Sequence, residues 1–181
     1  MPSTESSAED LQDAAALWSV SAVRGTTVVA AACDALVAGL DSPALRRLAA
    51  CFQHEADYDV PEILPMALDE LGLVHYPLGS RAGEGAAVRA LAYQHLVGKV
   101  TARELASEIH RHFGHRVPLG ERLAELDDEY DMLEYAGRTA EQVDADVTAE
   151  TRLLASHRRV SAAEAIGSPT RVRTLPVRPR V

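Results

Sequence analysis

Apolar side chains recur at intervals of three and four residues along most of the chain. This spacing places them on one side of a helix, whereas a half-buried strand would carry them at every second position. Combined with capping residues and helix-ending glycines, the pattern predicts eight helices. Their approximate ranges are 9–24, 26–40, 43–52, 59–71, 86–97, 101–113, 119–135 and 139–157.

The clearest apolar stripe lies in the range 119–135. Its members are Leu119, Leu123, Leu126, Tyr130 and Leu133. The spacing is that of a helix that packs along one seam. We therefore expect Leu126, in the middle of the stripe, to belong to the core.

Local signals mark several helix ends. Ser42 before Pro43 is typical of an N-cap followed by proline at the first helical position. Thr101 and Glu104 form a capping box, as Asp59 and Glu62 do in looser form, with aspartate as the cap. The range 59–71 also contains Pro65, which should kink that helix or delay its start.

The longest predicted internal loop is 73–85, which contains Pro77 and three glycines. The helical domain could divide there. We predict an all-α fold of about eight helices in one compact, bundle-like domain over residues 9–157. Residues 1–8 should be disordered. Residues 158–181 should form an extended basic tail, because Pro176 and Pro179 prevent a helix there.

The length and composition agree with this fold. A chain of 181 residues with 47% hydrophobic residues is long enough to bury a substantial core. No apolar run approaches the roughly 20 residues needed to cross a bilayer, and from the polar, acidic N-terminus we expect no secretory signal. With only two cysteines, a disulfide framework is not indicated. These features predict a cytoplasmic protein.

Charge is distributed unevenly along the chain. Residues 152–181 contain seven arginines and one glutamate, which gives +6, so residues 1–151 carry −15 and the two sum to −9. An acidic body with a basic tail indicates a partner of opposite charge, or docking of the tail on an acidic face. The candidate partner-binding residues are Asp128 and Asp131 in the body and Arg171, Arg173, Arg178 and Arg180 in the tail.

The most site-like region combines three histidines with an acidic run. His110, His112 and His115 could supply imidazole ligands to a transition metal. Residues two apart point to opposite sides of a helix, so His112 should meet His115 across the turn at Gly114 rather than meet His110. The candidate metal ligands are His112, His115, Asp127 and Asp128. Alternatively, the histidines are cations gathered at a helix C-terminus, and the acids are a solvated face.

Other chemistry has little support. Cys51 and His54 have a Cys-x-x-His spacing, but Cys33 is 18 residues away and a structural zinc site needs four ligands. No P-loop and no Gly-x-Ser-x-Gly motif occurs. A helix-turn-helix over 102–135 is disfavoured, since its second helix is acidic and would repel phosphate.

Two segments carry a family resemblance. Leu-Asp-Ser-Pro-Ala-Leu-Arg at 40–46 and Leu-Asp-Asp-Glu-Tyr-Asp at 126–131 resemble parts of small all-helical actinobacterial proteins of unknown function. The similarity extends over about residues 10–155. It implies the helical fold and no activity.

These observations favour a non-enzymatic interaction protein, such as a regulator, an accessory subunit or an immunity-type inhibitor. It would use its acidic helical surface and basic tail to bind a protein partner or to form a homo-oligomer, and it would need no cofactor. The alternative is a metal-dependent or His/carboxylate enzyme with a divalent transition metal. That enzyme would be centred on His95, the His110–His115 cluster and the Asp127–Asp131 run.

Overall fold

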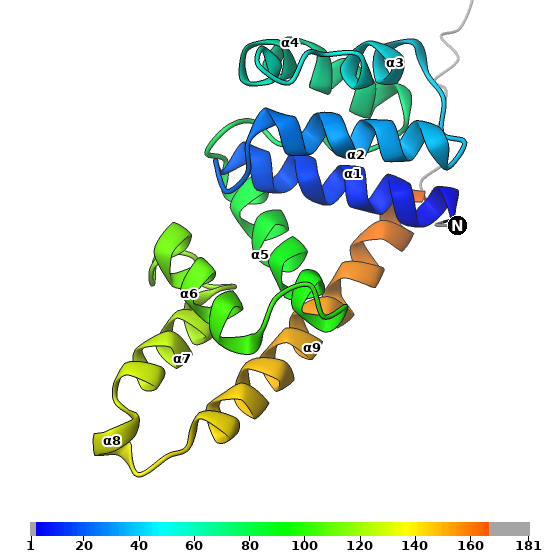
Figure 1. Ribbon diagram of the computed structural model, residues 1–181. Coiled ribbons are helices and arrows are strands. Elements are labelled where there is room, and N and C mark those ends of the chain that lie inside the picture. Colours follow the sequence, from blue (N-terminus) through cyan, green and yellow to red (C-terminus); the bar gives the residue numbers. More distant parts are fainter. Residues whose placement is uncertain (1–2, 167–181) are drawn as a thin grey trace, which may run out of the picture.

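The computed structural model describes residues 3–166, which form helices and connecting loops without any strand (Figure 1). The predicted all-α fold is therefore confirmed. Within these residues the helices are α1 (Thr4–Ser19), α2 (Gly25–Val37), α3 (Pro43–Ala49), α4 (Ala56–Glu70), α5 (Arg81–Leu96), α6 (Ala102–Phe113), α7 (Glu121–Asp131), α8 (Leu133–Ala136) and α9 (Ala140–Ile166).

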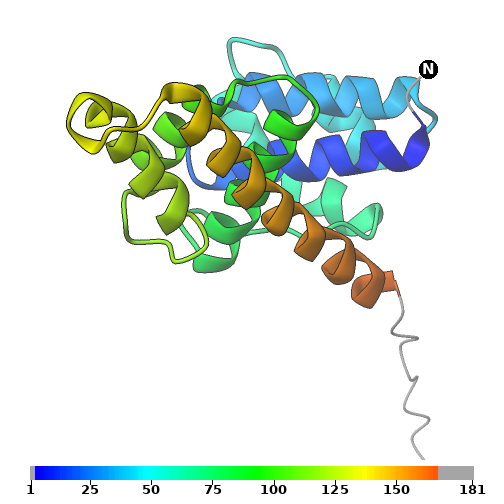
Figure 2. The ribbon, with the colours of Figure 1, turned by 90° about the horizontal axis from the view of Figure 1, so that it is seen from below.

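The helices enclose two groups of buried side chains. In Figure 1, α1 and α2 lie side by side beneath α3 and α4, and these four helices surround one cluster, which includes Leu11 and Leu45. The second cluster, which includes Phe113 and Leu126, is formed mainly by α5, α6, α7 and α9. Leu17 at the end of α1 belongs to this second cluster, and packing of α1 on α5 joins the two groups. Figure 2 shows the long α9 running obliquely past α5.

Both ends of the described chain are more helical than predicted. α1 begins at Thr4, because the Ser3 hydroxyl accepts a hydrogen bond from the Ser6 N–H at 3.1 Å and caps the helix. Residues 4–8 are thus helical rather than disordered. α9 continues to Ile166, so residues 158–166 of the predicted extended tail are also helical. The predicted tail arginines, from Arg171 onward, lie outside the described residues.

α4 begins at Ala56, and the predicted capping box at Asp59 is wrong. The acids of α4 cap other helices instead. Asp57 Oδ1 accepts a hydrogen bond from the Gly25 N–H at 2.6 Å, at the start of α2. Glu70 accepts one from the Ala44 N–H at 2.8 Å, at the start of α3. That N–H, with the Ser42 hydroxyl, lowers the pKa of Glu70, so its carboxylate stays charged.

The predicted loop 73–85 is shorter in the structure, because α5 begins at Arg81. Ser80 caps this helix by accepting a hydrogen bond from the Gly83 N–H at 3.2 Å. A Cβ at Gly83 would lie 2.5 Å from Ser19 Oγ. The glycine therefore serves the close approach of α5 to α1 rather than a loop.

The predicted helix 119–135 is divided into α7 and α8 at Met132. Leu123, Leu126 and Tyr130 are buried, which confirms the centre of the stripe as core. Gly137, with a φ of +64°, ends α8 in the left-handed conformation that glycine adopts readily. Predicted caps at Ser42 and at Thr101 with Glu104 are also present.

Candidate functional site

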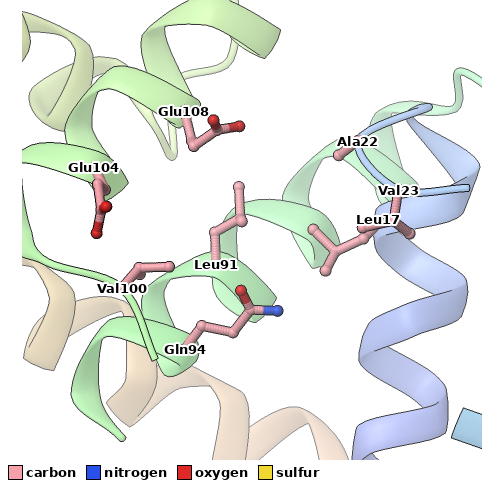
Figure 3. A pocket seen from close by; sticks show the side chains of 8 residues that line it. All are labelled: Leu17, Ala22, Val23, Leu91, Gln94, Val100, Glu104 and Glu108. Carbon is pink, nitrogen blue, oxygen red and sulfur yellow. The ribbon is translucent and has the colours of Figure 1, made fainter. Parts of the chain in front are cut away.

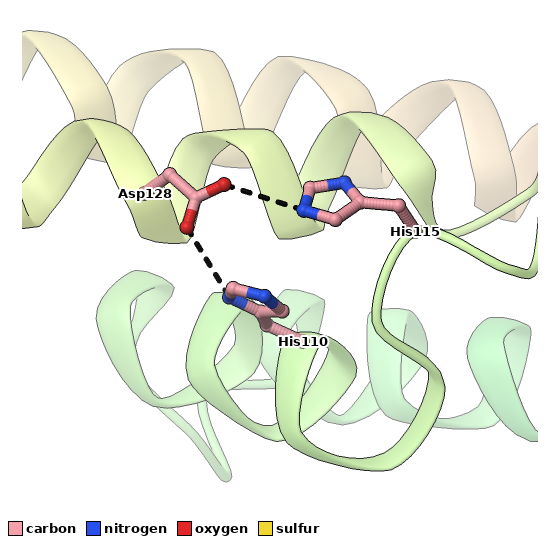
Figure 4. Close-up of side chains that lie close together, drawn as sticks. All are labelled: His110, His115 and Asp128. Atoms are coloured by element: carbon pink, nitrogen blue, oxygen red, sulfur yellow. Dashed lines mark ion pairs between the residues drawn. The ribbon is translucent and has the colours of Figure 1, made fainter.

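A histidine–carboxylate cluster lies between the C-terminal end of α6 and the middle of α7 (Figure 4). α6 ends at Phe113, and Gly114 follows with a φ of +55° while its N–H donates to the His110 carbonyl at 2.8 Å. This turn brings His115 back beside His110. Their ring centroids lie 5.1 Å apart, with the ring planes inclined at 61°.

α7 supplies two carboxylates to this cluster. Asp127 Oδ2 lies 3.0 Å from His110 Nδ1. Asp128 presents one oxygen to each ring: Oδ1 lies 3.6 Å from His110 Nδ1, and Oδ2 lies 3.3 Å from His115 Nε2. One ligand atom each from His110, His115 and Asp128 lies within 4.8 Å of the others. The cluster thus has the donor types of a transition-metal site.

The structure places His110, and not His112, beside His115. His112 Nε2 is buried 3.3 Å from Glu108 Oε2, without a hydrogen bond. The separation of His110 from His112 follows the predicted helix geometry, but spacing alone could not tell which of the two faces α7. Of the four predicted metal ligands, His115 and Asp128 belong with His110 to the group whose ligand atoms converge, Asp127 lies beside that group in contact with His110, and His112 lies apart from it.

His95, a residue of the alternative enzyme hypothesis, has structural partners. Its Nδ1 lies 3.0 Å from the Val100 carbonyl, and its Nε2 lies 3.2 Å from Thr148 Oγ1. The ring therefore links the end of α5 to α9. These contacts occupy both nitrogens and leave neither one for a ligand.

Solvent reaches the histidine–carboxylate cluster directly. The His115 side chain is 48% exposed and that of Asp128 is 56% exposed. Ser107, His110, Arg111 and Asp127 line an adjoining depression of about 260 Å³. An ion from solution can enter the cluster without any opening of the fold.

A larger pocket of about 320 Å³ lies where the end of α1 and the following turn face α5 and α6 (Figure 3). Leu17, Val23 and Leu91 give it apolar walls, and Glu104 and Glu108 lie on its α6 side. Glu104 already accepts hydrogen bonds from the Thr101 N–H and hydroxyl, which lower its pKa. Glu108 pairs with Arg111 and with His112. Both carboxylates are thus occupied within α6 and its cap.

The predicted acidic surface of α7 is largely paired within the molecule. Glu125 and Glu129 of α7 raise the pKa of Arg122. Asp146 of α9, and to a smaller extent Glu129, raise the pKa of Arg138, as expected for ion pairs. The pairs are Arg122 with Glu125 (3.0 Å) and Glu129 (3.1 Å), Arg138 with Glu129 and with Asp146 (2.5 Å), and Arg103 with Asp131 (3.6 Å).

Tyr130 joins α7 to α9 by donating a hydrogen bond to Asp144. Burial raises the pKa of Tyr130, and the bond to the Asp144 carboxylate raises it further. The Arg103 guanidinium lies 5.2 Å from the centre of the tyrosine ring. This side of α7 therefore serves packing and leaves little free negative charge.

A second acidic surface lies on α4, and the sequence analysis did not identify it. Four exposed side chains recur at helical spacing: Tyr58, Glu62, Met66 and Asp69. We call these four residues the α4 face. Among the described residues, neither the Glu62 carboxylate nor the Asp69 carboxylate forms an ion pair or a hydrogen bond. Tyr58, with 85% of its surface exposed, is the most accessible large apolar side chain described.

The sequence does contain a signal for this surface. Between Arg47 and Arg81 there is no lysine or arginine. The acidic residues in that interval are Glu55, Asp57, Asp59, Glu62, Asp69 and Glu70. A long interval with one sign of charge indicates a surface with an unneutralised field, even where no run of consecutive acids draws attention to it.

The cysteines give no site in the described part of the chain. Cys33 and Cys51 are both free. Burial raises the pKa of Cys51, and the charge of Asp59 raises it further. A thiol in such surroundings is a poor nucleophile. Within the described part of the chain, Cys51 and His54 do not belong to any group of three side chains that could hold a metal ion.

Comparisons with protein-family models, with curated proteins and with solved structures find no match. Within residues 3–166, none of the helices has the length and apolar character needed to traverse a bilayer. The fold and the surfaces define an all-α protein with a histidine–carboxylate cluster between α6 and α7 and an acidic, tyrosine-bearing face on α4.

Proposed function

We propose that this chain is a non-enzymatic interaction protein that binds a basic segment of a partner protein on the α4 face. A regulator, an accessory subunit or an immunity-type inhibitor would act in this way, in the cytoplasm. The observation that carries the proposal is the combination of exposed apolar and unpaired acidic side chains on one side of α4. There Tyr58 and Met66 alternate with Glu62 and Asp69.

The chemistry of the α4 face fits a basic, amphipathic ligand. From Tyr58 to Asp69 the stripe covers about 17 Å of helix, which is enough for a short helix or an extended peptide. Tyrosine is favoured at the centre of interfaces because it buries a large surface at a small entropic cost, and methionine adapts its shape. Unpaired carboxylates attract arginine and lysine over long range and set the orientation of the partner.

The α7 surface is the weaker candidate for the same role. Asp128 and Asp131, the predicted partner-binding acids, already have His110, His115 and Arg103 beside them. A basic partner would have to replace these internal pairs, so it would gain less from each new contact. On α4, Glu62 and Asp69 need give up only water.

A site-specific cross-link in the native host tests this assignment. A photo-reactive phenylalanine analogue replaces Tyr58, and in a second strain it replaces Tyr135 of α8. Tyr135 is the matched control, because it is 82% exposed and lies among the acids of the α7–α8 region.

We expect the probe at position 58 to cross-link a protein with a basic segment, and Glu62→Lys in the same chain to abolish the product. A cross-linked product from position 135 alone would contradict the proposal and would indicate that the partner binds the α7 surface. Equal products from both positions would also contradict it, because they would show indiscriminate contact.

The basic tail offers a further prediction. Residues 168–181 contain four arginines and no acid, so in the absence of a partner we expect them to dock on the α4 face of the same or a twin subunit. Deleting them should lower the melting temperature by about 2–4 °C at low salt. High salt should remove the difference, because it screens exposed pairs.

Melting curves and light-scattering mass at two salt concentrations measure this effect. The control is the same deletion of residues 168–181 in a chain that carries Glu62→Lys and Asp69→Lys. In that chain the deletion should not lower the melting temperature further. Equal melting temperatures and equal masses for the intact and the shortened chain would show that the tail does not dock.

A further inference from the structure

We propose that His110, His115 and Asp128 bind a divalent transition-metal ion of the zinc type. This inference is independent of the interaction on α4, since it involves other residues at another place in the fold. It concerns metal binding and no reaction. The observation that carries it is the convergence of two imidazoles and a carboxylate from α6, its C-terminal turn and α7 (Figure 4).

The distances within the cluster are close to those of a tetrahedral site. Ligand atoms about 2.0–2.2 Å from one zinc ion lie about 3.3–3.6 Å from each other. Asp128 Oδ2 lies 3.3 Å from His115 Nε2, and the other carboxylate oxygen, Oδ1, lies 3.6 Å from His110 Nδ1. All three ligand atoms already fall within 4.8 Å of one another, so movements of about 1 Å bring them onto a common ion.

The backbone holds these donors in place. The Gly114 N–H, by bonding the His110 carbonyl at 2.8 Å, closes the turn that returns His115 to the end of α6. On the other side, α7 is fixed by Leu123 and Leu126 in the core. The ligands therefore come from rigid elements, while His115 and Asp128 remain exposed enough to adjust to an ion.

Asp127 lies beside the three proposed ligands. Its Oδ2 lies 3.0 Å from His110 Nδ1, so a second carboxylate stands beside the proposed ligand nitrogen. Two imidazoles favour zinc, copper, nickel or iron, whereas magnesium and calcium prefer sites made of oxygen alone. The donor set thus selects a transition metal over the alkaline-earth ions.

The same contacts have a second explanation, which is that they are ion pairs that hold α6 against α7. The two explanations differ at His115. An ion pair needs only His110 with Asp127, whereas a metal site needs His115 and Asp128 as well. His115 and Asp128 are therefore the residues to change, and His110, which contacts both aspartates, is left intact to preserve the fold.

The test is a zinc titration of the full chain, purified without a histidine tag and freed of metal with a chelator. Calorimetry should show one strong site per chain, and His115→Ala and Asp128→Asn should each weaken it at least tenfold. The matched control is His54→Ala, because His54 is an exposed imidazole beside a single carboxylate, Glu55, at 3.5 Å. This control should bind zinc as the unchanged chain does.

Ring signals in NMR spectra of the unchanged chain keep the test independent of any variant's stability. Zinc should move the His110 and His115 ring signals together and leave those of His54 and His75 in place, while magnesium should move none. Retention of the strong site in His115→Ala would overturn the inference. Zinc-dependent shifts confined to His54 and His75, or no binding at millimolar zinc, would also overturn it.

Discussion

Replacing Leu126 by alanine is expected to lower the free energy of unfolding by about 2–5 kcal/mol. Leu126 is fully buried in the cluster formed by α5, α6, α7 and α9. Truncation removes its transfer free energy and leaves a cavity, because helices that pack on several sides cannot collapse into the space. Urea unfolding, followed by circular dichroism and analysed by linear extrapolation, measures the change.

The matched control for this prediction is Leu78→Ala. Leu78 lies in the loop before α5 and is largely exposed, so the same substitution there should change stability by no more than about 0.5 kcal/mol. A loss under about 1 kcal/mol at Leu126 would show that α7 is not packed as described.

Replacing Gly25 by alanine should also destabilise the fold, by about 1–3 kcal/mol. In the interior of an ordinary helix, replacing glycine by alanine raises the free energy of unfolding by about 0.5–1 kcal/mol. The expected sign is reversed because a Cβ at Gly25 would lie 2.6 Å from the Ala56 carbonyl oxygen and 3.0 Å from the Asp57 nitrogen. Both are backbone atoms of α4, so relief requires that α2 and α4 move apart, which also strains the bond from the Gly25 N–H to Asp57.

Gly85→Ala in α5 is the matched control for Gly25→Ala. There the nearest atom to a new Cβ is Arg89 Nη1 at 3.6 Å, an ordinary contact, so alanine should be neutral or stabilising by up to about 1 kcal/mol. The thermal or urea stability of the two variants gives the comparison. Stabilisation of similar size by both substitutions would contradict the close approach of α2 to α4.

The features that the sequence predicted well are local ones. The Thr101–Glu104 capping box, the Ser42 cap and the stripe around Leu126 depend on neighbours within one or two turns, and the structure contains all three. The predicted start of α4 was wrong because Asp57 takes part in a tertiary contact. Asp57 accepts a hydrogen bond from the first N–H of α2, which belongs to Gly25, 32 positions away in the sequence. No pattern within α4 predicts this contact.

The two candidate sites show the same limit. Helical spacing separates His110 from His112, but only the packing of α7 on α6 decides which of them meets Asp128. The acidic run 127–131 attracts attention in the sequence, yet arginines pair with Glu129 and Asp131, and His110 and His115 lie beside Asp127 and Asp128. Glu62 and Asp69 are seven residues apart in the sequence and come to share one face only on the helix.

The affinity of the cross-linked partner, purified and titrated against variants of this chain, is the most direct measurement of the central claim. We predict that Tyr58→Ala with Glu62→Lys weakens binding by about tenfold or more, equivalent to about 1.4 kcal/mol. The matched pair Tyr135→Ala with Glu134→Lys, which makes the same kinds of change on α8, should leave it within about twofold. Equal losses from the two pairs, or no loss from the first, would contradict the assignment of the α4 face as the binding surface.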